Sequence, residues 1–503
     1  MEAYRKFQIN FENTSIILAV IFFLVHLFFL NTPFNTDEGT HTLVSMFYRD
    51  IIKYIFSGHF SFQDIYNYAI KYLVYYPKIS LYYLPLYYLI NFLIFNFYPG
   101  IIAARLMSLI LMSISVYLMF KLVYLFTEDE RVSFLSTLLF ATSTLVNESS
   151  VLAMGEATLL FSAILAMYLF YNYYAKNKFF KTAFLFLPPL IFARQQSIFI
   201  FISFIFLIIL NKQWKKFLIL IVPFILYTLF YILQYKLGLI SVTLRFSIID
   251  ELHKFPELFS FDWFTYYPLG LLFSYLIFPM GFLSIIGFFY WFKERKPWQI
   301  LLLNLFFINF LFFQIVRNKS LRFPILCIIP LSIASAQITS KLFIGKLKFV
   351  LLSTLLILGA CVYNYEFLTQ KNFDFSFVNL INDTGDVLIA SENADIYSSV
   401  IMAEYAKNHP RDKLFYRPCS IFYYKVIPDN VRYVLLVQPP NEALKDELAK
   451  NINYIISNNN LTILFSTHQN ENIISLYENL NYNSSVTSKC NYICILDNKV
   501  CYK

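Results

Sequence analysis

Two neighbouring carboxylates, Asp37 and Glu38, follow the first hydrophobic segment of the chain, in the stretch Asn35-Thr36-Asp37-Glu38-Gly39-Thr40-His41. On the far side of a bilayer there is no ATP or nucleotide sugar. A carboxylate at that surface could act as a base on a substrate whose other half is a lipid. A structural role fits as well, because Thr36 or Asp37 could cap the next helix. These residues alone leave both interpretations open.

The composition is that of an integral membrane protein. Of the 503 residues, 58% are hydrophobic and only 14% are charged, whereas globular proteins carry about 25% charged residues. The net charge of +9 comes from Lys and Arg in short loops between apolar runs. This pattern follows the positive-inside tendency of membrane proteins, and it does not indicate a nucleic-acid partner. No small-residue cleavage site follows the first apolar segment, so we expect a retained first helix.

The hydrophobic pattern predicts an all-α polytopic membrane domain over residues 1–371. A membrane-spanning helix needs about 20 apolar residues. We predict about eleven spans, at 14–31, 101–125, 132–147, 154–174, 182–194, 195–211, 217–236, 268–292, 298–316, 322–340 and 348–366. An odd number of spans places the C-terminus on the side opposite the N-terminus.

Residues 32–100 are predicted to form one long extracytoplasmic loop. The segment 79–97 is also apolar, but Pro85 in its middle fits a broken or surface-lying element. If this segment crossed the membrane, the most basic loops would no longer share the cytoplasmic side. Those loops are 175–181, 211–216, 293–297 and 341–348.

Within this loop, apolar residues recur at helical spacing between residues 43 and 55. This pattern predicts an amphipathic helix lying on the membrane surface. The apolar face is predicted to hold Leu43, Phe47, Ile51, Tyr54 and Ile55, and the opposite face Arg49, Asp50 and Lys53.

From residue 372 onward the long apolar runs stop. Buried strands are predicted at 386–391, 432–437, 461–466 and 473–477, and helices at 396–407 and 442–456. Strands that alternate with helices indicate a soluble α/β domain over 372–503, which we expect outside the cytoplasm. The region contains none of the nucleotide-binding or zinc-protease motifs. Cys419, Cys490, Cys494 and Cys501 could form disulfides there.

Three motifs together resemble the polytopic glycosyltransferases of the protein-O-mannosyltransferase and lipid A aminoarabinose transferase type, the glycosyltransferase family 39-like superfamily with the C-type (GT-C) fold. The stretch from Asp37 to His41 resembles the acidic motif in that family's first outside loop. The stretch 76–88 is similar to its Pro-Pro-Leu-Tyr-Tyr element, which is followed by an arginine, here Arg105. The stretch 318–324 is similar to the segment that opens a late span.

The sequence departs from the family pattern in two places. The double proline is Leu84-Pro85 here. In the second outside loop, 147–156, Glu156 stands where the family often has an aspartate, and no arginine precedes it.

The resemblance implies a membrane enzyme that moves a sugar from a polyprenyl-phosphate carrier to a protein, lipid or glycan acceptor, with inversion at the anomeric carbon. Asp37 occupies the family's base position and would take the acceptor's proton. Glu38 would orient Asp37 or bind the acceptor, and His41 could support either role. Residues 79–97 could line a groove for the carrier lipid.

The leaving phosphate needs fixed positive charge, which arginine supplies with bidentate geometry. Arg322 and Arg194 fall at the outer ends of predicted spans, and Lys78 is a third candidate. A divalent cation could bridge Asp37, Glu156 and the phosphate, but no cofactor is required.

Structural roles compete with these assignments. The arginines could snorkel to lipid headgroups, Lys78 could anchor the interface, and His41 could lie on a helix surface. Glu156 also suits a helix N-terminus. At the level of the whole protein, the alternatives are a lipid-linked-sugar transporter or flippase and a non-catalytic scaffold that binds such lipids. A transporter usually carries ionisable residues in the middle of its spans, whereas here they lie near span ends.

Overall fold

The computed structural model describes most of the membrane domain and parts of the C-terminal region. The described residues are 11–32, 36–75, 84–236, 260–276, 279–316, 320–342, 351, 353–359, 378, 380–381, 386–391, 402–403, 415–416, 431–438, 457, 461–469, 472–480, 491–495 and 498–502. They belong to two compact units. The bundle unit comprises Met1–Thr32, Leu81–Tyr87 and Arg105–Gln370, and the loop unit comprises Pro33–Ser80, Tyr88–Ala104 and Lys371–Lys503.

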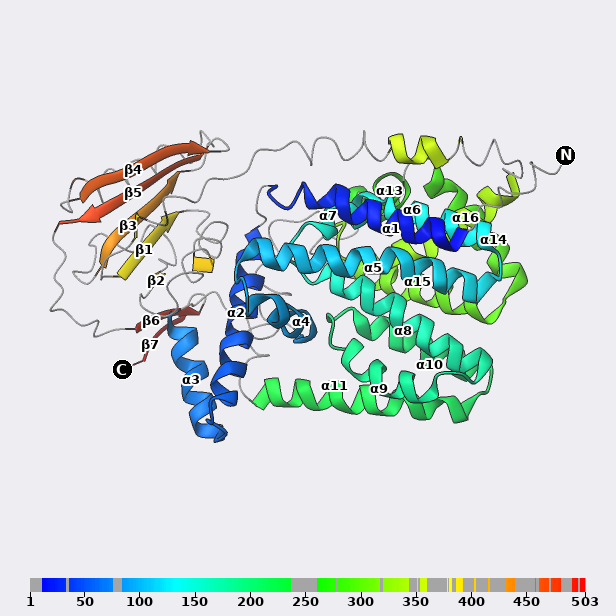
Figure 1. The fold of residues 1–503 in the computed structure, drawn as a ribbon, viewed down its shortest axis with the longest axis horizontal. Helices are drawn as coiled ribbons and strands as arrows, with labels where there is room; N and C mark the ends of the chain where they lie inside the picture. Colours follow the sequence, from blue (N-terminus) through cyan, green and yellow to red (C-terminus); the bar gives the residue numbers. More distant parts are fainter. Residues whose placement is uncertain are drawn as a thin grey trace. The chain divides into compact units, whose positions relative to one another are not determined.

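Most of the helices lie in the bundle unit (Figure 1). They are α1 (Phe11–Leu27), α5 (Ile101–Thr127), α6 (Glu130–Ala141), α7 (Thr144–Ser150), α8 (Glu156–Lys176), α9 (Phe180–Leu190), α10 (Ser197–Leu210), η2 (Trp214–Phe217), α11 (Leu218–Lys236), α13 (Phe261–Gly270), η3 (Leu271–Tyr275), α14 (Met280–Glu294), α15 (Pro297–Ile315), η4 (Ile325–Cys327) and α16 (Ile328–Leu342).

Five helical segments among the described residues are long and apolar enough to cross a membrane. They are Ile101–Thr127, Glu156–Lys176, Trp214–Leu233, Pro297–Ile315 and Ile325–Leu342, and each coincides with a predicted span. Shorter apolar helices, α1, α9 and α10, form where three more spans were predicted. The total of eleven spans stays a prediction, and the last of them, 348–366, lies mostly outside the described residues.

Two predicted spans are not single helices. The predicted span 132–147 is interrupted because α6 ends at Ala141 and Ser143 is extended, with φ −66° and ψ 134°. The predicted span 268–292 is interrupted between η3 and α14, where Leu276 is extended and Pro279 precedes the first turn of α14. Proline lacks an N–H donor, so Pro279 cannot continue a helix that comes from its N-terminal side, and α14 begins directly after it although both sides are apolar.

Basic loops of the bundle unit meet at one end of it. The Lys216 ammonium donates to the Tyr173 carbonyl at 2.9 Å, which joins η2 to the end of α8. Lys176 forms an ion pair with Glu128 at 3.9 Å, which joins the end of α8 to the loop after α5. These contacts place the loops near 176 and 216 together, as the charge pattern predicted.

Aromatic contacts bring α14, α15 and α16 to this same end of the bundle unit. The ring of Trp298, at the start of α15, stacks on Phe126 near the end of α5 at 5.7 Å and meets Trp291 of α14 edge-on at 5.4 Å. The Lys341 ammonium lies over the Tyr290 ring at 3.7 Å. The loops near 295 and 341 therefore lie at the same end as those near 176 and 216.

Close helix packing supports the core of the bundle unit. A Cβ added at Gly287 of α14 would lie 2.6 Å from the Ala334 carbonyl oxygen of α16. The two backbones can therefore approach only because residue 287 has no side chain. On α11, by contrast, Leu218, Ile225 and Leu229 are exposed apolar residues, which is the surface that a lipid-facing helix presents.

The loop unit contains α2 (Thr36–Phe56), α3 (Phe62–Tyr75) and most of α4 (Leu86–Phe95). α4 is too short to cross a membrane and begins directly after Pro85, as the proline suggested. The prediction that α2 lies on the membrane with Leu43 and Phe47 facing lipid is wrong, because both side chains are buried. Their apolar face packs within the protein, and helical periodicity alone cannot separate a protein partner from a lipid partner, because both are apolar.

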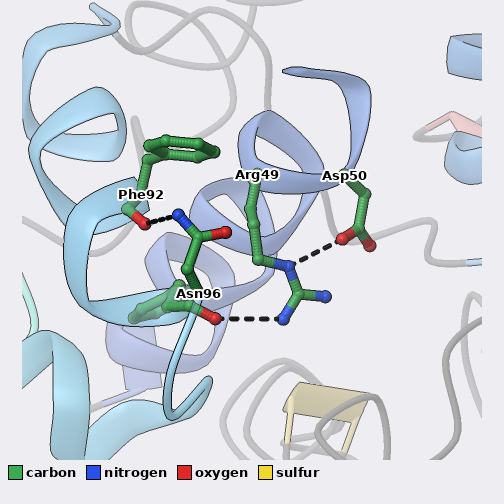
Figure 2. A network of polar contacts seen from close by, with 5 residues as sticks. Arg49, Asp50, Phe92 and Asn96 are labelled. Atoms are coloured by element: carbon green, nitrogen blue, oxygen red, sulfur yellow. Dashed lines mark hydrogen bonds and ion pairs between the residues drawn. The ribbon is translucent and has the colours of Figure 1, made fainter. Parts of the chain in front are cut away.

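Polar contacts fix the pairing of α2 with α4. Asn91 of α4 donates to the Ser45 hydroxyl at 3.0 Å. Arg49 pairs with Asp50 at 2.6 Å and donates to the Phe95 carbonyl at 3.4 Å, so it neutralises the C-terminal end of α4. Figure 2 shows this arrangement beside Asn96, which donates to the Phe92 carbonyl. Arg49 and Asp50 are therefore largely buried, so the prediction that they face away from the apolar side is wrong for these two residues, whereas Lys53 is exposed as expected.

Four C-terminal strands, β1, β3, β4 and β5, form at the predicted positions, whereas β2, β6 and β7 were not predicted. A five-stranded sheet has the order β2-β1-β3-β5-β4, with β1 (Asp386–Ser391) parallel to β2 (Phe415–Tyr416) and β3 (Val431–Gln438), while β5 (Asn472–Asn479) is antiparallel to β3 and to β4 (Leu461–Gln469). β6 (Asn491–Ile495) and β7 (Asn498–Tyr502) form a separate pair. The predicted helices 396–407 and 442–456 fall almost entirely outside the described residues, so the α/β layering stays a prediction, as does the domain boundary near 372.

Candidate functional site

A buried ion pair joins two residues that the sequence had placed in separate roles. Glu156 is the first residue of α8, and Arg194 lies in the link between α9 and α10. The Arg194 guanidinium pairs with the Glu156 carboxylate, whose side chain is only 3% exposed, against 16% for Arg194. Glu156 does occupy a helix N-terminus, as predicted. Because Arg194 neutralises it, Glu156 needs no metal ion to balance its charge.

Arg322 lies beside this pair. One of its guanidinium nitrogens, Nη1, contacts the Met154 sulfur at 3.2 Å, and Met154 comes shortly before Glu156 in the sequence. The backbone around Arg322 is fixed by two tyrosines, since Tyr275 donates to the Leu321 carbonyl and the Ser320 amide donates to the Tyr267 hydroxyl at 3.3 Å. Arg322 and Arg194 therefore belong to one end of the bundle unit.

A second carboxyl completes this charged group. Glu148 lies in α7 and is partly buried. Burial raises the pKa of its carboxyl above the ordinary value, the charge of Arg322 opposes that rise, and the charge of Glu156 adds to it. We call Glu148, Glu156, Arg194 and Arg322 the charge cluster. Its members come from α7, α8, the α9–α10 link and the segment before η4.

The charge cluster lies at the end of the bundle unit away from the basic loops. α8 carries Glu156 at its first residue and Lys176 at its last. At about 1.5 Å of rise per residue, these two ends lie about 30 Å apart, which is the thickness of the hydrocarbon core of a bilayer. The sequence analysis assigned no role to Glu148. The available signal was a carboxylate in the second predicted outside loop, among small and apolar residues.

Arg105, the arginine noted after the Pro-rich element, has a structural environment. It is fully buried at the start of α5, and it donates to the Leu30 and Thr32 carbonyls at 2.8 and 2.7 Å. These carbonyls follow the end of α1 and have no partners within that helix. Arg105 thereby fixes the chain shortly before Asp37.

The acidic pair lies in the first turn of α2. Glu38 is fully buried, and Asp37 is partly exposed. A helix N-terminus favours negative charge, so this position suits both the structural and the catalytic interpretation. Asp37, with its exposed surface, can meet a substrate, whereas the burial of Glu38 fits a supporting role.

His41 is a packing residue of the α2–α4 pair rather than a surface residue. Its Nδ1 hydrogen-bonds with the Tyr88 hydroxyl at 2.8 Å, and the two rings stack at 5.9 Å. Ser45 donates to the His41 carbonyl at 2.9 Å. His41 therefore holds the start of α2 against α4.

Two predictions about the site are not tested by the structure. Lys78 lies outside the described residues. Within the described parts of the chain, no group of three or more His, Cys, Asp or Glu residues is arranged to hold a metal ion. Asp37 and Glu156, the two residues expected to share a bridging cation, belong to different units, each of which is described by itself. The metal stays a hypothesis.

Comparison with known families and structures supports the resemblance drawn from the motifs. The family model of dolichyl-phosphate-mannose-protein mannosyltransferase matches residues 72–246. No curated protein sequence matches this chain.

Three solved structures have similar folds. ArnT from Cupriavidus metallidurans in the apo state aligns at 12% identity and a TM-score of 0.57, covering 93% of this chain and 98% of ArnT. The same protein bound to undecaprenyl phosphate aligns at 12% identity and 0.54, covering 95% and 99%. The Archaeoglobus fulgidus oligosaccharyltransferase in complex with zinc and sulfate aligns at 12% identity and 0.51, covering 88% and 70%. At this level of identity the similarity establishes the fold.

Proposed function

We propose that this chain, which has the fold of the C-type glycosyltransferases, is a membrane glycosyltransferase that takes its sugar from a polyprenyl-phosphate carrier. The observation that carries the proposal is the charge cluster. It places two arginines from distant parts of the sequence at one end of a bundle of apolar helices. A lipid phosphate needs such fixed cations at the membrane surface. The ArnT structure with bound undecaprenyl phosphate is consistent with this ligand class.

The chemistry assigned to the chain is an inverting transfer. The acceptor hydroxyl oxygen attacks the anomeric carbon while Asp37 accepts the hydroxyl proton. The bond between the anomeric carbon and the phosphate oxygen breaks, and the phosphate leaves with the electron pair. Arg322 supplies fixed positive charge for that phosphate. Arg194, whose charge is balanced by Glu156, can still donate hydrogen bonds to the phosphate oxygens. The acceptor class, whether protein, lipid or glycan, is not specified by these residues.

The proposal fixes an orientation that can be measured. We expect the end of the bundle unit that carries the basic loops to lie in the cytoplasm. The charge cluster, the α2–α4 region and the C-terminal strands should lie outside. Ser61, Thr462 and Lys215 are exposed, so each can be replaced by cysteine. In intact cells, a membrane-impermeant maleimide should label Ser61→Cys and Thr462→Cys but not Lys215→Cys.

The unsubstituted chain measures the background from native cysteines, and permeabilised cells confirm that Lys215→Cys can react. Labelling of Lys215→Cys from outside in intact cells would contradict the orientation.

The function itself is tested by transfer of radiolabelled sugar from a polyprenyl-phosphate sugar to an acceptor by the purified protein in detergent. A glycosyltransferase forms the glycosylated acceptor and releases the polyprenyl phosphate. If the donor binds but remains intact with every acceptor class, and instead moves between leaflets in proteoliposomes, the flippase alternative is correct.

A further inference from the structure

We propose that Tyr267 and Tyr275 are positioning residues for the donor phosphate, because their hydroxyl groups hold the turn that carries Arg322. We call these two residues the tyrosine pair. The inference rests on the proposed function, in which Arg322 is the residue that meets the phosphate. Neither tyrosine needs to touch the lipid donor. Each acts through Arg322, so its effect on donor binding should depend on the presence of that arginine.

Arg322 lies in a turn rather than in a helix. The Phe323 amide donates to the Ser320 carbonyl at 3.0 Å, which closes a four-residue turn with Arg322 at its third position. The next helical segment, η4, begins only at Ile325. A helix holds its residues by a ladder of backbone hydrogen bonds, whereas this turn has one such bond. Contacts with other elements must therefore fix the direction of the Arg322 side chain.

The tyrosine pair supplies these contacts to the two residues directly before Arg322. The Tyr275 hydroxyl donates to the Leu321 carbonyl, and the Ser320 amide donates to the Tyr267 hydroxyl at 3.3 Å. Both tyrosine side chains are fully buried. Backbone groups outside a helix need partners inside a membrane domain, where water is scarce. The two hydroxyls meet this need, and they thereby fix the orientation of the turn.

The helical segment that carries the tyrosine pair is built so that both side chains face the same way. Tyr267 lies in α13, and Tyr275 is the last residue of η3, which is a π-helical turn. In an uninterrupted α-helix, residues eight positions apart differ by about 80° around the axis. A π turn forms its hydrogen bonds between residues i and i+5 and so takes more residues per turn. It therefore brings Tyr275 back toward the face of Tyr267.

Packing joins the same segment to the turn. A Cβ added at Gly270, the last residue of α13, would lie 2.2 Å from Cδ2 of Leu321. The absence of a side chain at position 270 thus lets the helix lie directly against Leu321. The Tyr266 hydroxyl also hydrogen-bonds with the Leu321 backbone. The turn before Arg322 is therefore held by several contacts with one continuous segment, α13–η3.

The far end of the Arg322 side chain shows what this orientation achieves. Nη1 contacts the Met154 sulfur at 3.2 Å, and Cζ lies 5.9 Å from the centre of the Phe323 ring. A phosphate that accepts two parallel hydrogen bonds requires the guanidinium at a defined position and angle. A turn released by the tyrosine pair would move the guanidinium away from Met154, and the arginine would spend less time in the position that suits the phosphate.

The experiment is a double-mutant cycle that measures binding of undecaprenyl phosphate to the purified full chain in detergent. The variants are Tyr267→Phe, Tyr275→Phe and the two together, each in the wild-type and in the Arg322→Ala background. Phenylalanine keeps the ring and removes only the hydroxyl. One hydrogen bond corresponds to about a 2- to 10-fold change in an equilibrium constant. The double tyrosine variant should therefore bind the lipid about 2- to 10-fold more weakly than wild type. In the Arg322→Ala background the same substitutions should have no further effect.

Tyr117→Phe is the matched control. The Tyr117 hydroxyl donates to Glu12 at 3.2 Å, which joins α5 to α1. This variant also loses one side-chain hydrogen bond in the bundle unit, but outside the α13–η3 segment, and it should bind the lipid as wild type does. Steady-state kinetics gives a second measurement. The tyrosine-pair variants should raise the KM for the lipid donor and leave the KM for the acceptor unchanged. A general loss of stability would instead lower the active fraction, and hence kcat alone.

The cycle separates failure of the inference from failure of the proposed function. Equal weakening by the tyrosine substitutions with and without Arg322 would show that they do not act through it, and the inference would be wrong. It would also be wrong if the tyrosine variants bind like Tyr117→Phe while Arg322→Ala binds weakly, and the phosphate site would then stand. If wild-type protein does not bind the lipid, or Arg322→Ala binds it normally, the donor site itself is wrong. Should the double variant not fold, each single variant gives the same cycle with a smaller effect.

Discussion

Replacement of Asp37 by Asn should reduce sugar transfer by about 10²- to 10⁴-fold, because a positioned general base contributes about that much to the rate. The substitution keeps the size of the side chain and its position in the first turn of α2, but an amide cannot accept the acceptor's proton. Binding of the lipid donor should be largely retained. Transfer of radiolabelled sugar and binding of the donor are measured on the same purified protein.

The control for this prediction is Asp64→Asn. Asp64 also lies in the first turn of a helix of the loop unit, α3, and it is exposed. Loss of its charge costs the same favourable interaction with a helix N-terminus, about 0.3–1 kcal/mol, so this variant shows what helix stability alone does to activity. Transfer by Asp37→Asn at the level of Asp64→Asn would mean that Asp37 is a structural residue. That result would favour the non-catalytic scaffold and the transporter over the glycosyltransferase.

Replacement of Arg322 by Ala should raise the apparent KM for the lipid donor and lower turnover. A hydrogen bond to a charged group contributes about 1.5–3 kcal/mol, so kcat/KM should fall by about 10- to 100-fold. Arg322→Lys should recover only part of this loss, because an ammonium cannot form the two parallel hydrogen bonds of a guanidinium. Steady-state kinetics with varied donor concentration separates the two parameters.

Arg131→Ala is the matched control, because Arg131 is an exposed arginine in the first turn of α6, close to the basic end. A thermal melt of each variant shows whether the fold persists. Full activity of Arg322→Ala would remove Arg322 from the donor site, whereas equal losses in Arg322→Ala and Arg131→Ala would point to a general effect on stability.

The sequence by itself determined the local features of this protein. Runs of apolar residues identified the long helices, because a segment that leaves water for lipid must be apolar along its length. The four principal C-terminal strands, β1, β3, β4 and β5, could also be predicted, since each has an apolar stretch between turn residues. The same holds for the acidic pair at the start of α2 and for Glu156 at the start of α8, since a residue's place at a helix end depends on its neighbours in the sequence.

The partners of these residues depend on the tertiary structure. Arg105 and Leu30 are 75 positions apart, yet the guanidinium of one binds the carbonyl of the other. Likewise, the pairing of Arg194 with Glu156 and the contact of Arg322 with Met154 follow from how α8, α10 and the η4 segment pack. Electrostatic energy depends on distance and burial, and neither can be obtained from spacing along the chain. The sequence analysis therefore named three of the four residues of the charge cluster but missed Glu148 and the pairing.

The clearest difference concerns α2. Its apolar residues have the periodicity of a surface helix on a membrane, but Leu43 and Phe47 are buried in the protein, and His41, Ser45 and Arg49 make polar contacts with α4. The sequence determined that α2 is a helix with an apolar face, because the period of the pattern is a local property. Only the tertiary structure decided what covers that face, because lipid and protein are equally apolar and a hydrophobic side chain gains free energy from leaving water in either of them.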